Sequence, residues 1–250
     1  MRSSHSLDRV DTAFDDDRLV ADAGLLLPAT LASHLGLKEL VERHLDLGDK
    51  PGRANAGDKL LTLVMSALAG GDCIDDVVAL GAGGTGRILG FTLKAASTLG
   101  TFLRSFSWGH VRQLDRVSRE LLARAWAAGA GPGAEPFTID LDSTICETYG
   151  LKKAGARHHT YTHVRVTDRD SETLTLEADH RRHAEIENAI RIGLAEGIVT
   201  TKTLRRRLFS LPGRLTRSAR RLTLHLPARW PWAIGWAAAI ARIRAIPLLA

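Results

Sequence analysis

The feature that most constrains this chain is a short stretch of alternating side chains followed at once by small hydroxyl residues. Residues 137–142 read FTIDLD, with apolar and polar residues at alternate positions. This alternation predicts a strand that is buried on one face, with Asp140 and Asp142 projecting together from the other. Ser143 and Thr144 follow directly. Oxygen ligands at a strand end suit a hard cation such as Mg²⁺, although an isolated pair of this kind is more typical of a solvent-facing edge.

Length and charge allow a sizeable core and favour an anionic partner. The chain has 250 residues, of which 44% are hydrophobic, enough for one large domain or two small ones. The formal net charge is +6, a balance that favours anionic partners but says nothing about the fold. Bases are concentrated in the last quarter of the chain, whereas the first stretch is acidic, with Asp8, Asp11, Asp15, Asp16 and Asp17.

Cysteine usage and hydropathy indicate an intracellular protein. Cys73 and Cys146 lie far apart and form no metal-binding pair, so we expect free thiols in a reducing compartment. Residues 1–17 are polar throughout and predict no signal peptide. The most apolar run, 230–250, is interrupted by arginines and prolines and would span a membrane poorly. We therefore expect a cytoplasmic protein without a membrane partner.

The region from 21 to 130 is predicted to be helical. Apolar residues recur at helical spacing over 28–47 and 58–69, where Asp58 can act as the N-cap and Gly70-Gly71 as the end. Residues 81–86 match the GxGxxG pattern of dinucleotide sites. They lack a clear preceding strand and an acid at the required distance, so we interpret them as a glycine-rich turn.

Two further helices, over 97–106 with Ser97 as N-cap and over 108–128, are joined by a tight turn. This arrangement fits either a helix-turn-helix that contacts DNA or an ordinary helical hairpin with solvated arginines, and the pattern does not separate the two. Residues 129–136 are rich in glycine and proline and predict a linker, hence a domain boundary.

Histidines and acids beyond the predicted strand allow several kinds of site. His158, His159 and His163 could bind a metal, but no fourth ligand accompanies them, and phosphate contact or solvation is more typical of such clusters. In the predicted helix 177–191, residues 180, 183 and 187 share one face. That face suits a zinc site, a carboxylate for a catalytic metal, or a simple polar surface.

The segment from Lys202 to Arg221 is strongly basic and contains no acid. Leucines at 204, 208, 211 and 215 give it an apolar stripe. Such a run favours contact with a phosphate backbone over a membrane-surface helix. A strand over 223–226 and a small amphipathic helix after Trp230 are expected to follow. The residues predicted to contact nucleic acid are Arg205, Arg206, Arg207, Arg214, Arg217, Arg220 and Arg221.

The sequence FTIDLDSTICETYGL at 137–151, with AGARHH at 154–159, closely resembles the DDE transposases of bacterial insertion sequences. The particular branch is the thirteen-eighty family, also described as transposase DDE domain group 1. Nearly the whole chain takes part in the resemblance, through 19–27, 70–76, 97–126, 177–191 and 199–232.

The resemblance implies an RNase H-like core in which three carboxylates hold two Mg²⁺ (or Mn²⁺) ions for in-line phosphoryl transfer. The first acid maps to Asp142, with Asp140 beside it, and the third maps to Glu187. Arg182 and His183 are implied DNA contacts. The implied partner is double-stranded DNA, both terminal inverted repeats and target, in the bacterial cytoplasm at the nucleoid, with self-association left open.

The second acid of the family has no counterpart here. The segment that should carry it, and a glycine-rich strand before it, are missing near 162–166, and a second gap falls at 191–192. The prediction is therefore an internally deleted transposase that binds element ends but lacks strand-transfer activity. The alternatives are a purely DNA-binding remnant and, more weakly, a small zinc protein.

The predicted fold class is α/β, with an incomplete RNase H-like catalytic core preceded by an all-helical N-terminal region and followed by a basic C-terminal segment. The expected divisions are a flexible tail (1–20), a helical DNA-binding region (21–130), a truncated DDE core (137–191) and a basic segment (192–250).

Overall fold

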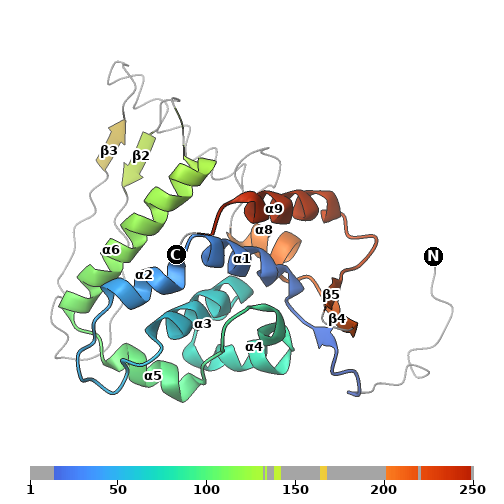
Figure 1. Ribbon diagram of the computed structural model, residues 1–250, viewed down its shortest axis with the longest axis horizontal. Helices are drawn as coiled ribbons and strands as arrows, with labels where there is room; N and C mark the ends of the chain where they lie inside the picture. The colour runs from blue at the N-terminus through green and yellow to red at the C-terminus, as the bar shows by residue number, and fades with distance from the viewer. Residues whose placement is uncertain are drawn as a thin grey trace. The chain divides into compact units, whose positions relative to one another are not determined.

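The computed structural model divides the chain into two units, 1–124 together with 199–250, and 125–198. The first unit contains most of the described elements (Figure 1). The residues that the structure describes are 14–131, 133, 138–141, 164–167, 201–218 and 221–248. Among these residues, no helix is both long enough and apolar enough to cross a bilayer.

The first unit combines helices with a small antiparallel sheet, consistent with the coarse α/β prediction. Its strands are β1 (Leu19–Val20), β4 (Gly213–Ser218) and β5 (Arg221–His225), in the order β1-β4-β5. Its helices, with α6 ending at the unit boundary, are α1 (Leu26–His34), α2 (Leu37–His44), α3 (Ala56–Ala69), α4 (Val77–Ala82), α5 (Ala96–Arg104), α6 (Trp108–Ala125), α8 (Thr201–Leu204) and α9 (Ala233–Ala245).

The apolar stripes of α2, α3, α5 and α6 meet in one core. Leu40, Val41 and Phe102 are almost fully buried there, and Leu61 and Val117 pack with them. The helices expected from apolar periodicity are therefore present, and α3 ends at Gly70 as predicted, in a left-handed conformation (φ 113°) that glycine adopts without strain.

The helix predicted over 28–47 is wrong in detail, because it is two helices. Gly36 adopts φ 67° between α1 and α2, and such a residue ends one helix and redirects the chain. The break lets both Leu35 and Leu37 be buried. The N-caps predicted at Asp58 and Ser97 are also wrong. α3 begins at Ala56 and α5 at Ala96, so both residues lie within the first turn of their helix.

The turn predicted at 81–86 is confirmed in part: Gly81 and Ala82 are the last residues of α4, and the turn itself lies at Gly83 and Gly84, before a 3-10 turn at Thr85–Ile88. Gly84 adopts φ 71°, and a Cβ atom there would lie 2.3 Å from the carbonyl oxygen of Leu19. Glycine is therefore needed for the close approach of this turn to β1, which is a packing reason and not a phosphate-binding one.

The C-terminal segment belongs to the same unit as the helices. Leu211, Trp236 and Ile240 bury themselves against Leu27, and α9 lies beside α1 (Figure 1). The leucine stripe at 204–215 does not form one helix: α8 and a π-helical turn (Arg205–Phe209) precede the strands β4 and β5. Pro212 and Gly213, which disfavour a continuing helix, stand where the helical part has ended and β4 begins.

In the second unit, the strand predicted over 137–142 is present as β2 (Thr138–Leu141), and Phe137 and Asp142 lie outside the described residues. It pairs antiparallel with β3 (Val164–Thr167), with Leu141 opposite Val164.

Candidate nucleic-acid interface

Most of the catalytic and DNA-contacting residues predicted from the resemblance lie outside the described residues. This applies to Asp142, Glu187, Arg182 and His183, and also to Arg220 of the basic segment. Asp140 is placed in β2, opposite Arg165 in the register. The prediction of a Mg²⁺ or Mn²⁺ site therefore stays a prediction, and the described basic residues define the site that can be built.

Arg205 is engaged in a structural contact at the C-terminus of α3. Its Nε donates to the carbonyl of Leu68 at 2.9 Å, and its Nη2 donates to the carbonyl of Ala67 at 3.0 Å. The last carbonyls of a helix lack partners within the helix and carry partial negative charge, so a guanidinium is well suited to them. This arginine holds the C-terminal segment against the helical region.

Arg207 is also held within the fold. Its guanidinium carbon lies 5.3 Å from the ring centre of Trp232, a cation–π contact. Its carbonyl accepts a hydrogen bond of 2.9 Å from the indole N–H of Trp230. Arg206, between these two, is exposed and has the freedom to meet an external anion.

The register of β4 and β5 sorts the remaining residues onto two faces. Opposed residues in an antiparallel pair project to the same side. Leu215 and Leu224 are opposed on the face toward the core, followed by Arg217 opposite Leu222 near the end of the hairpin. Leu215 is buried, whereas Arg217 is exposed.

The other side of the hairpin is entirely polar, and we call it the hairpin polar face. Its opposed pairs are Arg214 with His225, Thr216 with Thr223, and Ser218 with Arg221. The hydroxyl of Thr216 lies 2.8 Å from Nε2 of His225. Arg214, Arg221 and His225 are exposed. This face therefore presents cationic and neutral hydrogen-bonding groups, as a phosphate-binding surface requires.

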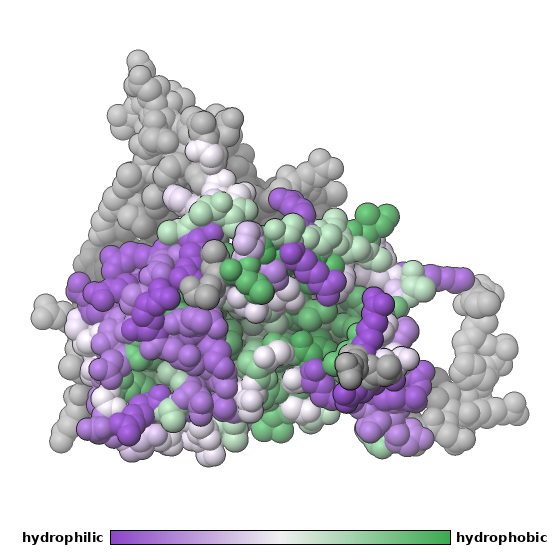
Figure 2. Space-filling view, viewed as in Figure 1, coloured by the Kyte–Doolittle hydropathy of each residue, from purple (hydrophilic) through white to green (hydrophobic). Residues whose placement is uncertain are grey.

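The stretch of sequence that contains this face carries basic residues and no acidic ones. From residue 197 to the C-terminus the chain has 11 Lys and Arg residues and no Asp or Glu. Hydrophilic residues gather over β4 and β5 in Figure 2. The acid that does approach the hairpin polar face comes from the start of the chain: Oδ2 of Asp16 lies 3.5 Å from Nε of Arg214.

A second basic surface lies on α6. Arg112, Arg116 and Arg119 are exposed and follow one another at intervals of four and three, so they share one side of the helix. Asp115 is exposed among them, which makes this surface less uniformly positive than the hairpin. α5 and α6 are joined by a short turn, in outline like a helix-turn-helix.

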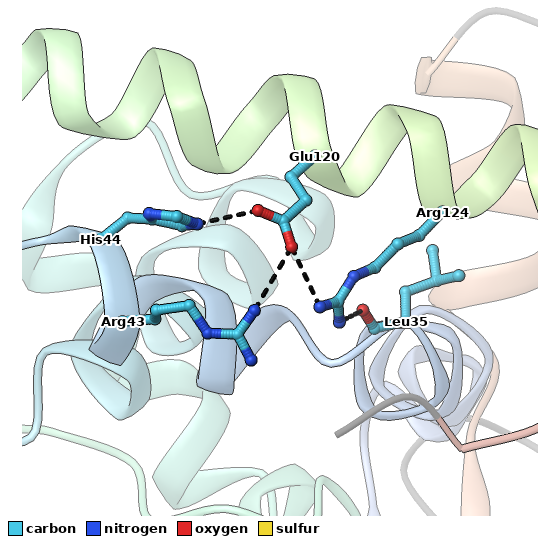
Figure 3. A network of polar contacts seen from close by, with 5 residues as sticks. All are labelled: Leu35, Arg43, His44, Glu120 and Arg124. Carbon is cyan, nitrogen blue, oxygen red and sulfur yellow. Dashed lines mark hydrogen bonds and ion pairs between the residues drawn. The ribbon is translucent and has the colours of Figure 1, made fainter.

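The inner side of α6 is fixed by a polar network around Glu120 (Figure 3). This carboxylate lies 2.8 Å from Nε2 of His44, 3.1 Å from Arg124 and 3.4 Å from Arg43. Arg124 also donates to the carbonyl of Leu35 at 2.9 Å. The hydrogen bond from His44, with Arg124 beside it, holds the pKa of Glu120 below its usual range. Arg124 thus links α6 to the end of α1, whereas Arg112, Arg116 and Arg119 are exposed on α6.

One group of potential metal ligands occurs in the described part of the chain. Asp72, Cys73 and Asp76 bring ligand atoms within 4.8 Å of one another, and all are exposed. Oδ2 of Asp76 accepts the backbone N–H groups of Asp72 and Cys73 at 2.9 and 3.0 Å. This acid therefore caps a helical turn, and a thiol is a poor partner for Mg²⁺.

Sequence reasoning singled out the arginines but missed His225, Thr216 and Asp16. The strand predicted over 223–226 is present, with shifted bounds, as β5. The alternation over 214–218 could also have indicated β4, but the leucine stripe of 204–215 favoured a helix there. The ion pair of Asp16 joins segments almost two hundred positions apart, and no local pattern indicates it.

The comparisons with known proteins give this site no precedent: no family model, no curated protein and no solved structure matches the chain.

Proposed function

We propose that this chain is a transposase-derived protein that binds double-stranded DNA, including the terminal inverted repeats and target DNA of an insertion sequence, without carrying out strand transfer. The observation that carries the proposal is the hairpin polar face, where Arg214 and Arg221 stand exposed within an acid-free segment. Binding of this kind requires no metal ion, because the cations come from the side chains.

The different contacts of the arginines in the basic segment support this proposal. Arg205 and Arg207 have partners inside the fold. Arg214 and Arg221 have no such internal partner in the described residues, apart from the surface contact of Arg214 with Asp16. A basic surface held rigidly by a sheet is a suitable platform for a charged polymer.

The test is a binding assay with a short DNA duplex in EDTA, comparing the wild type with Arg221→Gln. The expected result is metal-independent binding that weakens steeply with salt. Loss of one phosphate contact in the variant should lower the slope of log K against log salt by about 0.9.

The matched control is Arg53→Gln, which removes the same charge from an exposed arginine that pairs with Asp49 elsewhere on the surface. It should leave the slope unchanged. Equal slopes for the wild type and for Arg221→Gln would contradict the claim that the hairpin polar face contacts DNA phosphates.

A second candidate is active transposition by an RNase H-like core with Mg²⁺. The observation that favours it is β2, which is present where the first catalytic strand is expected. It predicts nicking of a supercoiled plasmid carrying the element ends, only with Mg²⁺ or Mn²⁺ and abolished by Asp142→Ala. Because the second acid has no counterpart in the sequence, we expect no nicking.

A further inference from the structure

An acidic segment from the start of the chain lies against the hairpin polar face. Oδ2 of Asp16 is 3.5 Å from Nε of Arg214, and Oδ1 accepts hydrogen bonds of 3.0 Å from both the backbone N–H and the Nε of Arg18. One carboxylate thus lies between two guanidinium groups. A phosphate oxygen would make the same contact with the guanidinium of Arg214.

The position of this carboxylate is imposed by the fold. β1 pairs with β4 so that Leu19 is opposite Arg214, and the N–H of Leu215 donates to the carbonyl of Arg18 at 2.9 Å. Arg87 donates to the carbonyl of Asp17 from the glycine-rich turn. The segment before β1 is therefore tied at two places, and its acids are held next to the hairpin.

The composition of the segment extends the contact. Asp15, Asp16 and Asp17 are consecutive, and Asp15 and Asp17 are exposed. Hydrogen bonds from Arg18 hold the pKa of Asp16 below its usual range, so this acid is ionised at neutral pH. Three adjacent negative charges beside an acid-free basic hairpin resemble a short piece of nucleic-acid backbone in charge.

We propose that Asp15–Asp17 form an autoinhibitory acidic strap, which competes with DNA phosphates for Arg214. The strap deepens the proposed function and rests on it, because it presupposes that the hairpin polar face binds DNA. The ion pair is at the surface, with the side chains of Arg214 and Asp16 48% and 26% exposed. Exposed pairs of this kind are weak, so a polyanion can displace the carboxylate and the strap weakens binding without preventing it.

The alternative is that Asp16 only orients Arg18 and supports β1. The two readings differ in a direct way. A purely structural carboxylate would lower stability when neutralised and leave DNA affinity unchanged, whereas a competing carboxylate would raise affinity when neutralised.

The experiment uses the full chain and a short fluorescent DNA duplex in EDTA at moderate salt. Asp16→Asn should bind about threefold more tightly than the wild type, the change expected when a weak surface ion pair no longer competes. Asp75→Asn removes the same charge from an exposed site on another element and should have little effect. Asp16→Glu keeps the charge and should not raise affinity.

A double variant locates the effect. In the Arg214→Gln background, Asp16→Asn should give no gain, because the contested arginine is gone. The strap is overturned if Asp16→Asn binds like Asp75→Asn, or if its gain persists without Arg214. Wild-type chain that fails to bind DNA, together with an Asp16→Asn variant that also fails, would instead overturn the proposed function itself. Circular dichroism of each variant establishes that the compared proteins are folded.

Discussion

At the scale of single residues, some charged side chains contact other parts of the fold, whereas others are exposed at the surface. Arg205 caps a helix and Arg124 links two helices, although both belong to sequence stretches that are rich in arginine. Arg214 and Arg221 are displayed on a sheet face instead. The sequence shows which residues are charged, but the distinction depends on contacts between segments far apart in the chain.

Asp58 is the clearest structural charge. It is buried, with Oδ1 2.8 Å from Nζ of Lys38 and Oδ2 3.3 Å from Nζ of Lys94. Asp58→Asn should lower the free energy of unfolding by about 2–3 kcal/mol, somewhat less than for a fully buried pair, since Lys38 is partly exposed. Urea denaturation measures this, with Asp46→Asn at an exposed site as control. A loss equal to that of the control would contradict the assignment.

The Glu120 network gives a prediction about pH. The pKa of Glu120 is lowered in the folded chain, first by the hydrogen bond from His44 and then by Arg124. A carboxyl whose pKa is lower folded than unfolded stabilises the fold fully above its unfolded pKa, and that stabilisation is lost as the pH falls through the folded pKa. The Glu120→Gln variant should therefore be less stable than the wild type at neutral pH, and the difference in stability between the two proteins should shrink as the pH falls into the acid range. A difference that grows as the pH falls would contradict this, with thermal denaturation from neutral to acidic pH as the measurement.

At the scale of elements, apolar periodicity predicted the helices well and the hairpin poorly. The stripes of α3 and α6 face a core that their own sequences define, so local pattern and tertiary packing agree. The segment 204–215 carries a helical stripe, but its leucines are divided among α8, the π-helical turn, the residues before β4 and β4 itself. Tertiary contacts decided that division, and Gly36 shows the same limit, because a single left-handed residue split an expected helix.

The turn before α5 offers a matched pair of glycines. Gly84 has φ 71° and would bring a Cβ atom to 2.3 Å from the carbonyl oxygen of Leu19, whereas Gly81 lies in α4 with open space around it. Gly84→Ala should destabilise the fold by at least about 2 kcal/mol, through positive-φ strain and displacement of β1. Gly81→Ala should be neutral or stabilising by up to about 1 kcal/mol, because alanine favours the helix. Similar midpoints in urea for the two variants would contradict the packing of this turn.

The end of α3 offers a matched pair of arginines. Arg205→Ala should lower stability by about 1–2 kcal/mol, since two helix-end carbonyls lose a charged donor. Arg206→Ala, at the exposed neighbour, should lower it little. DNA affinity should show the opposite order, with the larger loss for Arg206→Ala. An equal loss of DNA affinity in both variants would indicate that Arg205 contacts DNA, and would contradict its assignment to a purely structural contact.

At the scale of the whole molecule, the first unit joins the start, the helical region and the end of the chain. The sequence treats 192–250 as a separate basic segment, but Leu211, Phe209 and Trp236 are buried with residues of the helical region. The helices, the glycine turn and β2 were predictable, because each follows from local periodicity or a local breaker. The antiparallel register of β4 and β5, and the approach of Asp16, were not, because they depend on contacts across most of the chain.

The central claim is that the hairpin polar face binds the phosphate backbone of DNA. Its most direct measurement is the salt dependence of binding in EDTA for the wild type and for the double variant Arg214→Gln/Arg221→Gln. The account predicts metal-independent binding by the wild type and a slope of log K against log salt smaller by about 2 in the variant, for two lost phosphate contacts. Wild-type chain that does not bind DNA at low salt, or a double variant whose affinity and slope equal those of the wild type, would contradict it.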